Sequence, residues 1–165
     1  IFGATGGVME AALRTANDWL TGKDNKEVEF HEVRGTDGLK EATYNIAGMT
    51  VRVAVASGIA SANYIMDTIR SGNAPWDFVE IMCCPGGCVN GGGQPIQPAS
   101  VRSFTDLKTL RAKALYAQDE AMTLRKSHES PIIKKLYEEF FDDGIGGHKA
   151  HHCLHTTYVA RKKFQ

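Results

Sequence analysis

The chain has 165 residues, of which 42% are hydrophobic and 23% are charged, as expected of a globular domain with its own core. Its 19 basic residues balance its 19 acidic ones, so the charge does not indicate nucleic acid or a membrane surface as a partner. No apolar run is long enough to cross a bilayer, and the first residues do not resemble a signal peptide. The chain opens at Ile1 as if a strand were already under way, which indicates a severed or processed end.

The first third of the chain predicts a helix and three strands. Residues 6–20 follow a glycine turn and predict a helix, with an apolar face on Val8, Ala12, Thr15 and Trp19. The alternation over 28–33 predicts a short strand. Two β-rich runs on either side of Ala47-Gly48 predict a hairpin whose second arm is mostly buried, at 42–46 and 50–57.

The middle of the chain continues the α/β pattern and then breaks it. A second helix is predicted at 60–71, and a strand at 77–82 leads into a loop rich in glycine and proline at 84–98. Beyond that loop, helical patterns cover 105–122 and 130–141, followed by a segment at 148–158 that holds four of the six histidines. The predicted fold class is α/β: a three-layer lobe at 1–99 with a mostly parallel sheet, followed by a helical C-terminal belt at 100–165.

Three of the four cysteines lie within six residues, at Cys83, Cys84 and Cys88. Clustered thiols in a chain without a secretory signal favour metal or redox chemistry over disulfides. Cys84 and Cys88 share one glycine-rich turn, so their sulfurs can converge on one metal centre, and thiolates so spaced are common iron–sulfur ligands. The spacing alone leaves iron–sulfur, zinc and an inert glycine turn open.

The full stretch from Glu80 to Pro95 resembles the third signature motif of the iron-only hydrogenases, Glu-x-Met-x-Cys-x-x-Gly-Cys-x-x-Gly-Gly-Gly-Gln-Pro, with every fixed position present. The resemblance implies that Cys84 ligates the 4Fe–4S cubane of the H-cluster. It also implies that Cys88, the catalytic cysteine, ligates the cubane and bridges to the di-iron subsite, whose pocket Met82 lines. Cys83 stands where alanine is commoner, and a small core residue is its favoured interpretation.

Residues 2–14 are similar to the family's strand-to-helix segment beside the di-iron site. The resemblance implies that Phe2, Gly3 and Val8 shape the apolar wall around the diatomic ligands of the di-iron site. We therefore expect Gly3, Val8 and Met82 to form one concave wall near Cys88. The alternative of a phosphate-binding helix start is rejected, because the G-x-G-x-x-G and Walker patterns are absent from this segment.

The stretch from Arg125 to Tyr158 resembles the C-terminal tail of the same hydrogenases, which is a separate small subunit in some members. It departs from the family pattern at Cys153 and Thr157. The clustered histidines allow a zinc site, but their three- and four-residue spacing equally describes one side of a short helix. We favour capping and packing roles for these histidines.

The resemblance implies a ferredoxin-linked hydrogenase that catalyses reversible reduction of protons to H2 in the cytoplasm, with the periplasm possible for two-subunit relatives. The family's other two cubane cysteines belong to earlier motifs that this sequence does not contain, so its ligand set for the H-cluster is incomplete. We expect the missing N-terminal half of the catalytic domain to be the principal partner. The alternative is a non-catalytic iron–sulfur scaffold or assembly domain.

Overall fold

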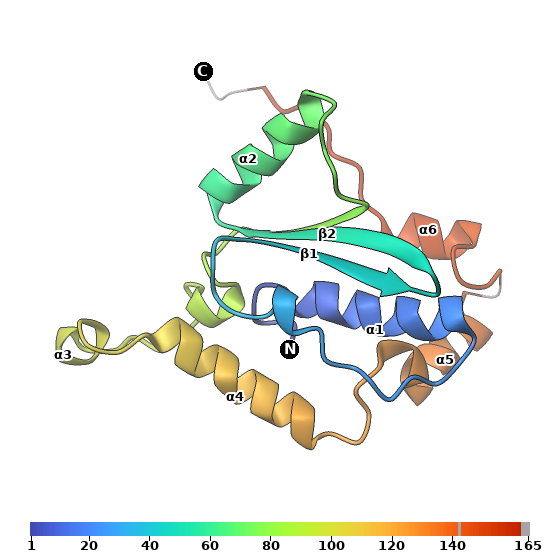
Figure 1. Cartoon of the computed structure of the whole chain (residues 1–165), viewed down its shortest axis with the longest axis horizontal. Helices are drawn as coiled ribbons and strands as arrows, with labels where there is room; N and C mark the ends of the chain where they lie inside the picture. Colours follow the sequence, from blue (N-terminus) through green and yellow to red (C-terminus); the bar gives the residue numbers. More distant parts are fainter. Residues whose placement is uncertain (142, 163–165) are drawn as a thin grey trace. The chain divides into compact units, whose positions relative to one another are not determined.

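The computed structural model describes residues 1–141 and 143–162, which fall into two compact units, Ile1–Lys126 and a second that begins at Ser127 (Figure 1). The first unit contains α1 (Gly7–Thr21), η1 (His31–Val33), β1 (Leu39–Ile46), β2 (Met49–Ser57), α2 (Ile59–Arg70), β3 (Phe78–Met82), η2 (Cys88–Asn90), α3 (Ala99–Arg102) and α4 (Leu107–Ala121). The second contains η3 (Ser127–Glu129), α5 (Pro131–Glu139) and α6 (His148–Leu154). Each unit is described by itself.

The sheet has the order β1-β2-β3 and is mixed. β1 and β2 are antiparallel and β2 and β3 are parallel, so the α/β class is confirmed while the expectation of a mostly parallel sheet is wrong. The reason is the two-residue turn between β1 and β2, where Ala47 and Gly48 both have positive φ angles, of 53° and 80°. Such a turn reverses the chain and matches the twist of the strands it joins.

Helices cover both faces of the sheet, so the three-layer arrangement is confirmed (Figure 1). Successive side chains of the central strand β2 point to opposite faces. Val53 and Val55 pack with Met9 and Leu13 of α1, whereas Ala54 and Ala56 pack with Ile65 of α2. Residues 53–57 therefore form a continuous buried run, as expected of a strand covered on both faces.

The buried face of α1 differs from the predicted one. Val8 and Trp19 are about half exposed, at 44% and 53%, while Met9 and Leu13 are buried. The rest of the buried face is polar or charged and consists of Glu10, Arg14 and Asp18. The apolar pattern mispredicted this face because the charged residues are buried by ion pairs with distant segments, which periodicity does not count.

The strand predicted at 28–33 is not formed. This stretch ends in the 3-10 turn η1, and its two buried apolar side chains are Phe30 and Val33. They are three residues apart, so a 3-10 turn places both on the same side, whereas a strand would direct them to opposite faces.

α4 packs against the rest of the first unit, whereas a belt over residues 100–165 stays a prediction. Arg111 donates hydrogen bonds to the carbonyl oxygens of Val89 and Pro95 at 3.0 and 3.1 Å. The hydroxyl oxygen of Tyr116 accepts a hydrogen bond from the amide of Gly35 at 3.3 Å. Helices also form within the later predicted segments, as α5 and α6. None of the helices in the described residues is long and apolar enough to span a membrane.

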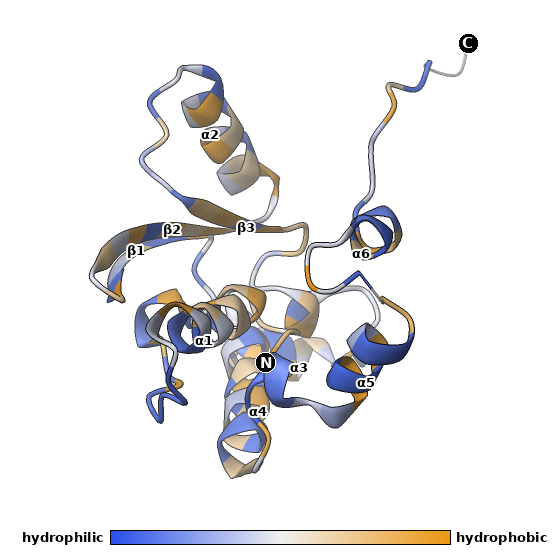
Figure 2. Ribbon diagram, turned by 90° about the vertical axis from the view of Figure 1, so that its right-hand side faces the viewer, coloured by the Kyte–Doolittle hydropathy of each residue, from blue (hydrophilic) through white to orange (hydrophobic). Residues whose placement is uncertain are grey.

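β3 is an edge strand with an apolar surface. Phe78 and Ile81 are 50% and 45% exposed, and hydrophobic residues lie along β3 and on α2 (Figure 2). The opposite edge of the sheet is different, because β1 exposes charged and polar residues such as Glu41, Thr43 and Asn45. Charged edges resist pairing with a further strand, whereas apolar edges invite it.

Candidate metal centre

β3 delivers the cysteines to a tight turn. The strand ends at Met82, and Cys84 and Cys88 follow at its C-terminal end, where the sequence analysis placed them. In open α/β sheets, ligands bind in this position. The amide of Gly87 donates a hydrogen bond to the carbonyl oxygen of Cys84 at 2.9 Å, and Cys88 opens η2. The turn thus keeps the two cysteines close together in the backbone.

The first residues of the chain lie against this turn. The amide of Thr5 donates to the carbonyl oxygen of Gly86 at 3.0 Å, and the amide of Val89 donates to the carbonyl oxygen of Gly3 at 2.9 Å. These two bonds flank Gly87. A Cβ atom at Gly87 would lie 2.7 Å from both the Gly3 oxygen and the Thr5 nitrogen, so only glycine allows this approach.

The predicted wall residues come from the elements around the turn. Gly3 accepts a hydrogen bond from the amide of Val89, the residue after Cys88. Met82 ends β3 two positions before Cys84. Phe2 is 57% exposed and Val8 is 44% exposed on the first turn of α1. The hydrogen bonds thus bring Gly3 to the cysteine loop, and one concave wall that also includes Val8 and Met82 stays a prediction.

The thiols of the loop are free to act as ligands. Cys84 is partly buried, Cys83 and Cys88 are exposed, and none of the three forms a disulfide. The expectation that Cys83 is a small core residue is therefore wrong. A Cβ atom built on Gly91 would lie 3.6 Å from the Cys84 sulfur and 3.7 Å from the Cys88 Cα atom, so both cysteines border the space beside Gly91. Two free thiols beside a glycine surface fit an iron–sulfur cluster, which is bulky and needs close backbone approach.

Glu80 is a residue of this region whose role the sequence analysis missed. It lies on β3, is buried, and accepts hydrogen bonds from the amides of Gly6 at 2.6 Å and Met9 at 2.7 Å. The residue before α1 is Gly6, which has no side chain to cap the helix, so the carboxylate of Glu80 caps it from the sheet. The only sequence signal was its place as the first fixed residue of the cysteine motif.

Lys40 of β1 approaches the same turn from another direction. Its Nζ atom donates hydrogen bonds to the carbonyl oxygens of Thr5 and Gly35, each at 2.9 Å. Burial lowers the pKa of Lys40 to about 8, and the carboxylates of Glu80 and Asp37 only partly offset this effect. Glu80 and Lys40 thus place two buried charged groups behind the turn that meets the cysteine loop.

A buried ionic network holds α1 against α4. Arg14 forms ion pairs with Glu10 at 2.9 Å and with Asp119 at 2.8 Å. Arg34 also pairs with Glu10 at 2.7 Å, and Arg125 pairs with Asp119 at 2.7 Å. Every charge of this network has a partner, which is the condition under which buried ion pairs are tolerated.

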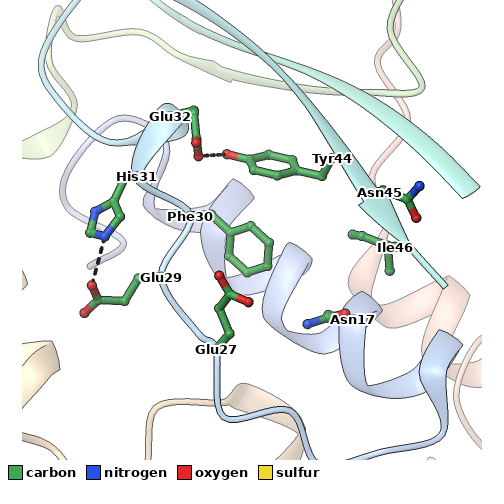
Figure 3. Close-up of a pocket in the computed structure, with 9 residues that line it drawn as sticks. All are labelled: Asn17, Glu27, Glu29, Phe30, His31, Glu32, Tyr44, Asn45 and Ile46. Carbon is green, nitrogen blue, oxygen red and sulfur yellow. Dashed lines mark hydrogen bonds and ion pairs between the residues drawn. The ribbon is translucent and has the colours of Figure 1, made fainter. Parts of the chain in front are cut away.

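One cavity of the first unit lies away from the cysteines. It has a volume of about 300 Å³ and lies between η1, β1 and α1, with Phe30 and Tyr44 in its lining (Figure 3). Glu32 accepts a hydrogen bond from the Tyr44 hydroxyl at 2.9 Å, and Glu29 pairs with His31 at 3.1 Å. These two carboxylates are therefore already engaged within the fold.

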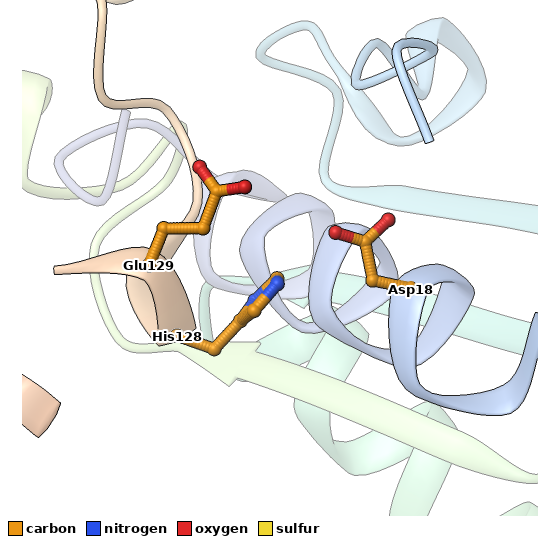
Figure 4. Close-up of side chains that lie close together, drawn as sticks. All are labelled: Asp18, His128 and Glu129. Carbon is orange, nitrogen blue, oxygen red and sulfur yellow. The ribbon is translucent and has the colours of Figure 1, made fainter. Parts of the chain in front are cut away.

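Within the described residues of the second unit, 127–141 and 143–162, the polar side chains alone give no metal centre. The His151 and His155 rings of the α6 segment stack with centroids 4.4 Å apart, and no group of three possible ligand atoms gathers among the histidines in the part of this segment that the structure describes. Figure 4 draws Asp18 on α1 with His128 and Glu129 on η3. Asp18 belongs to the first unit and the other two to the second, so no site is assigned to them together.

Two family models match the chain. The model described as "Iron only hydrogenase large subunit, C-terminal domain" matches residues 1–92, and "Iron hydrogenase small subunit" matches residues 105–161. Iron hydrogenase 1 of Clostridium pasteurianum is 43% identical over 159 residues, which make up 96% of this chain and 27% of that protein. A solved FeFe hydrogenase HydA1 from Chlamydomonas reinhardtii is 39% identical with a TM-score of 0.70, and the match covers 97% of this chain and 46% of that one.

A relative of a different kind also matches. Protein NAR1 of Arabidopsis thaliana is 32% identical over 160 residues, which make up 96% of this chain and 33% of that protein. The chain therefore spans between about a quarter and a half of the proteins that it resembles.

Proposed function

This chain belongs to the iron-only hydrogenase family, and on that premise we propose that it supplies two cysteine ligands to the H-cluster of an enzyme that interconverts protons and H2. Cys84 ligates the 4Fe–4S cubane. Cys88 would hold the same cubane and would also be the ligand that joins it to the di-iron subsite. When bound, such a centre supplies redox-active iron at which protons and electrons combine. Electrons come from a ferredoxin-type carrier, and the enzyme works in the cytoplasm.

The residues of this chain hold the centre and shape its surroundings. The thiolates of Cys84 and Cys88 fix it to the end of β3, and Gly87 and Gly91 let the backbone pass close beside it. Phe2, Gly3, Val8 and Met82 form an apolar wall that excludes water. Low polarity strengthens the electrostatic interactions inside such a site.

The observation that carries this proposal is the backbone pairing of the first residues with the cysteine loop. The Thr5–Gly86 and Val89–Gly3 hydrogen bonds join the two segments that the resemblance assigns to one pocket, although more than 80 residues separate them in the chain. A glycine-rich turn that only linked β3 to α3 would not need the first residues of the chain packed against it.

The remainder of the catalytic domain is the partner that completes the site. Residues 1–99 form the C-terminal lobe of the H-cluster domain, and residues 100–165 form the small-subunit-like tail. The apolar edge of β3, with Phe78 and Ile81 half exposed, gives the remainder of the domain a surface to pack against or a strand edge to pair with.

The proposal is tested in a protein that contains the complete hydrogenase domain. Cys84→Ser, Cys88→Ser and Cys83→Ser variants are purified, and their iron content and rate of H2 evolution are measured. Cys83 is the matched control, because it is a free exposed thiol of the same loop. We expect Cys88→Ser to lose H2 evolution, Cys84→Ser to lose iron, and Cys83→Ser to keep both. Wild-type activity in Cys88→Ser would refute the proposed role of that residue.

A second candidate function is that of a non-catalytic iron–sulfur scaffold or assembly factor. The similarity to NAR1, and to the cytosolic iron–sulfur assembly component 3 of Rattus norvegicus, favours it. A scaffold would bind a cubane through the same cysteines but would neither acquire a di-iron subsite nor evolve H2. The iron stoichiometry and H2 assay of the wild-type protein therefore separate the two functions.

A further inference from the structure

Two buried charged side chains stand behind the cysteine loop without being its ligands. Glu80 of β3 and Lys40 of β1 are each only 8% exposed. Burying a charged group is costly unless hydrogen bonds or a counter-charge compensate for it. Each side chain forms hydrogen bonds to one short stretch of backbone, the turn that leads into α1, at residues 4–9.

Glu80 holds the amide side of this turn. Its two carboxylate oxygens accept one hydrogen bond each, from Gly6 and from Met9, and both are shorter than 2.8 Å. A carboxylate at a helix N-terminus is favoured by the helix dipole and by the free amides there. Because these residues are more than 70 positions apart, the contact links the sheet to the start of α1.

Lys40 holds the carbonyl side of the turn. Its ammonium group donates to the carbonyl oxygen of Thr5. The amide of Thr5 donates to the cysteine loop, and the next amide, that of Gly6, donates to Glu80. A second bond to the carbonyl oxygen of Gly35 anchors the lysine to the segment before β1. Acceptors and donors of the turn are thus both held by side chains of the sheet.

Glu80 is also connected to the cysteines through β3. Four residues after Glu80 the chain reaches Cys84, and the loop then turns back to bind Thr5 and Gly3. We infer that Glu80 and Lys40 are positioning residues that fix the wall segment at residues 2–8 relative to Cys84 and Cys88. We call the hydrogen bonds of Glu80 and Lys40 to residues 4–9 the clamp. The clamp rests on the contacts described above, whereas its effect on the metal centre rests on the proposed function.

The first arm of the test measures the clamp in the complete protein before iron–sulfur loading. Hydrogen–deuterium exchange of residues 4–10 is followed in Glu80→Gln, Lys40→Met and Lys40→Arg. Glutamine can accept from only one of the two amides, so we expect exchange there to accelerate about tenfold or more, the equivalent of one lost hydrogen bond to a charged group. Lys40→Met should accelerate exchange in the same segment, and Lys40→Arg, which keeps the donors, should restore slow exchange.

Two variants control for the loss of a charge alone. Glu41→Gln changes an exposed carboxylate on the same strand as Lys40, and Lys113→Met removes an exposed lysine of α4. Neither should alter exchange at residues 4–10. Exchange as slow as in the wild type in both Glu80→Gln and Lys40→Met would overturn the clamp. If Glu80→Gln does not fold, Lys40→Met against Lys40→Arg carries the same comparison.

The second arm measures the metal centre in the loaded protein. Iron content and the infrared spectrum of the diatomic ligands are compared between the wild type, Glu80→Gln and Lys40→Met. Because the cysteines are unchanged, we expect the iron content to be retained and the infrared bands to shift. Faster exchange together with unshifted bands would mean that the clamp only stabilises the fold, which refutes the positioning role. A wild type without such bands refutes the proposed function instead, while the exchange result still decides the clamp.

Discussion

Arg14 of α1 and Asp119 of α4 form two parallel hydrogen bonds, of 2.9 and 2.8 Å, across 105 positions of the chain. This paired geometry gives the strongest kind of ion pair between side chains. It joins the first helix to a helix that the sequence analysis assigned to the C-terminal part, and both helices lie in the unit Ile1–Lys126.

Replacing Asp119 with asparagine should strongly destabilise the first unit. The substitution leaves Arg14 and Arg125 without a carboxylate that both of them bind, and breaking a buried pair in this way costs about 3 kcal/mol. The free energy of unfolding is measured by urea denaturation. Glu120→Gln, on the exposed side of the same helix, is the control and should change little. Equal stabilities of the two variants would contradict this account.

The stabilising effect of Asp119 should weaken in acid. Burial by itself raises the pKa of Asp119, but hydrogen bonds from Arg14 and Arg125 outweigh it and lower the pKa from 3.8 to about 2. A carboxyl group with a lowered pKa stabilises the fold fully above its unfolded value, and that stability is lost as the pH falls toward 2. We expect the difference between the wild type and Asp119→Asn to shrink by about 2 kcal/mol between pH 5 and pH 2. A difference independent of pH would argue against the lowered pKa.

Gly87→Ala should destabilise the protein far more than Gly92→Ala, although both glycines lie in the same loop. Gly87 has a φ angle of 95°, and a Cβ atom there would clash with Gly3 and Thr5. At Gly92, by contrast, no atom of the residues that the structure describes lies within 4 Å of an added Cβ atom. We expect Gly87→Ala to lose at least about 2 kcal/mol of stability and Gly92→Ala to change it by less than about 0.5 kcal/mol. Thermal denaturation of both variants gives the comparison. A tolerated Gly87→Ala would show that the first residues do not pack against the cysteine loop as described.

Thr5→Val should be neutral or stabilising. The Thr5 hydroxyl is buried and finds no hydrogen-bond partner among the residues that the structure describes. Removing an unsatisfied buried hydroxyl gains up to about 1 kcal/mol of stability, because no hydrogen bond compensates for the cost of desolvating it. The comparison variant is Thr109→Val, which loses the 2.7 Å hydrogen bond from the Thr109 hydroxyl to Asp106 and should be destabilised. Chemical denaturation measures both, and a destabilised Thr5→Val would indicate that its hydroxyl is bonded in the protein.

The 165-residue chain by itself should not evolve H2, even after iron–sulfur reconstitution and delivery of a synthetic di-iron complex. On the proposed ligand set it provides two of the four cubane thiolates, so any cubane it acquires should be substoichiometric and lost to chelators. Gas chromatography and iron analysis check both expectations. Adding the remainder of the catalytic domain should restore cluster retention and turnover. H2 evolution from the chain alone would contradict the account of its ligand set.

The sequence by itself determined the parts of this protein that depend on local chemistry. The hairpin, the second helix and the strand leading to Cys84 and Cys88 were predictable, because turns, apolar runs and glycines act over a few residues. The family was also predictable, since the motif from Glu80 to Pro95 combines many fixed positions in one short stretch, and the family model over residues 1–92 confirms it.

Only the tertiary structure decided which charged residues are buried and what they hold in place. Glu10 and Arg14 resemble an ordinary solvated pair in the sequence, and nothing local indicates that Asp119 completes their network or that Glu80 caps the first helix. The same limit explains the strand wrongly expected at 28–33, where packing of Phe30 and Val33 favours a 3-10 turn. Buried charges are stabilised by partners far away in the chain, and their pairing is a property of the folded backbone rather than of any sequence window.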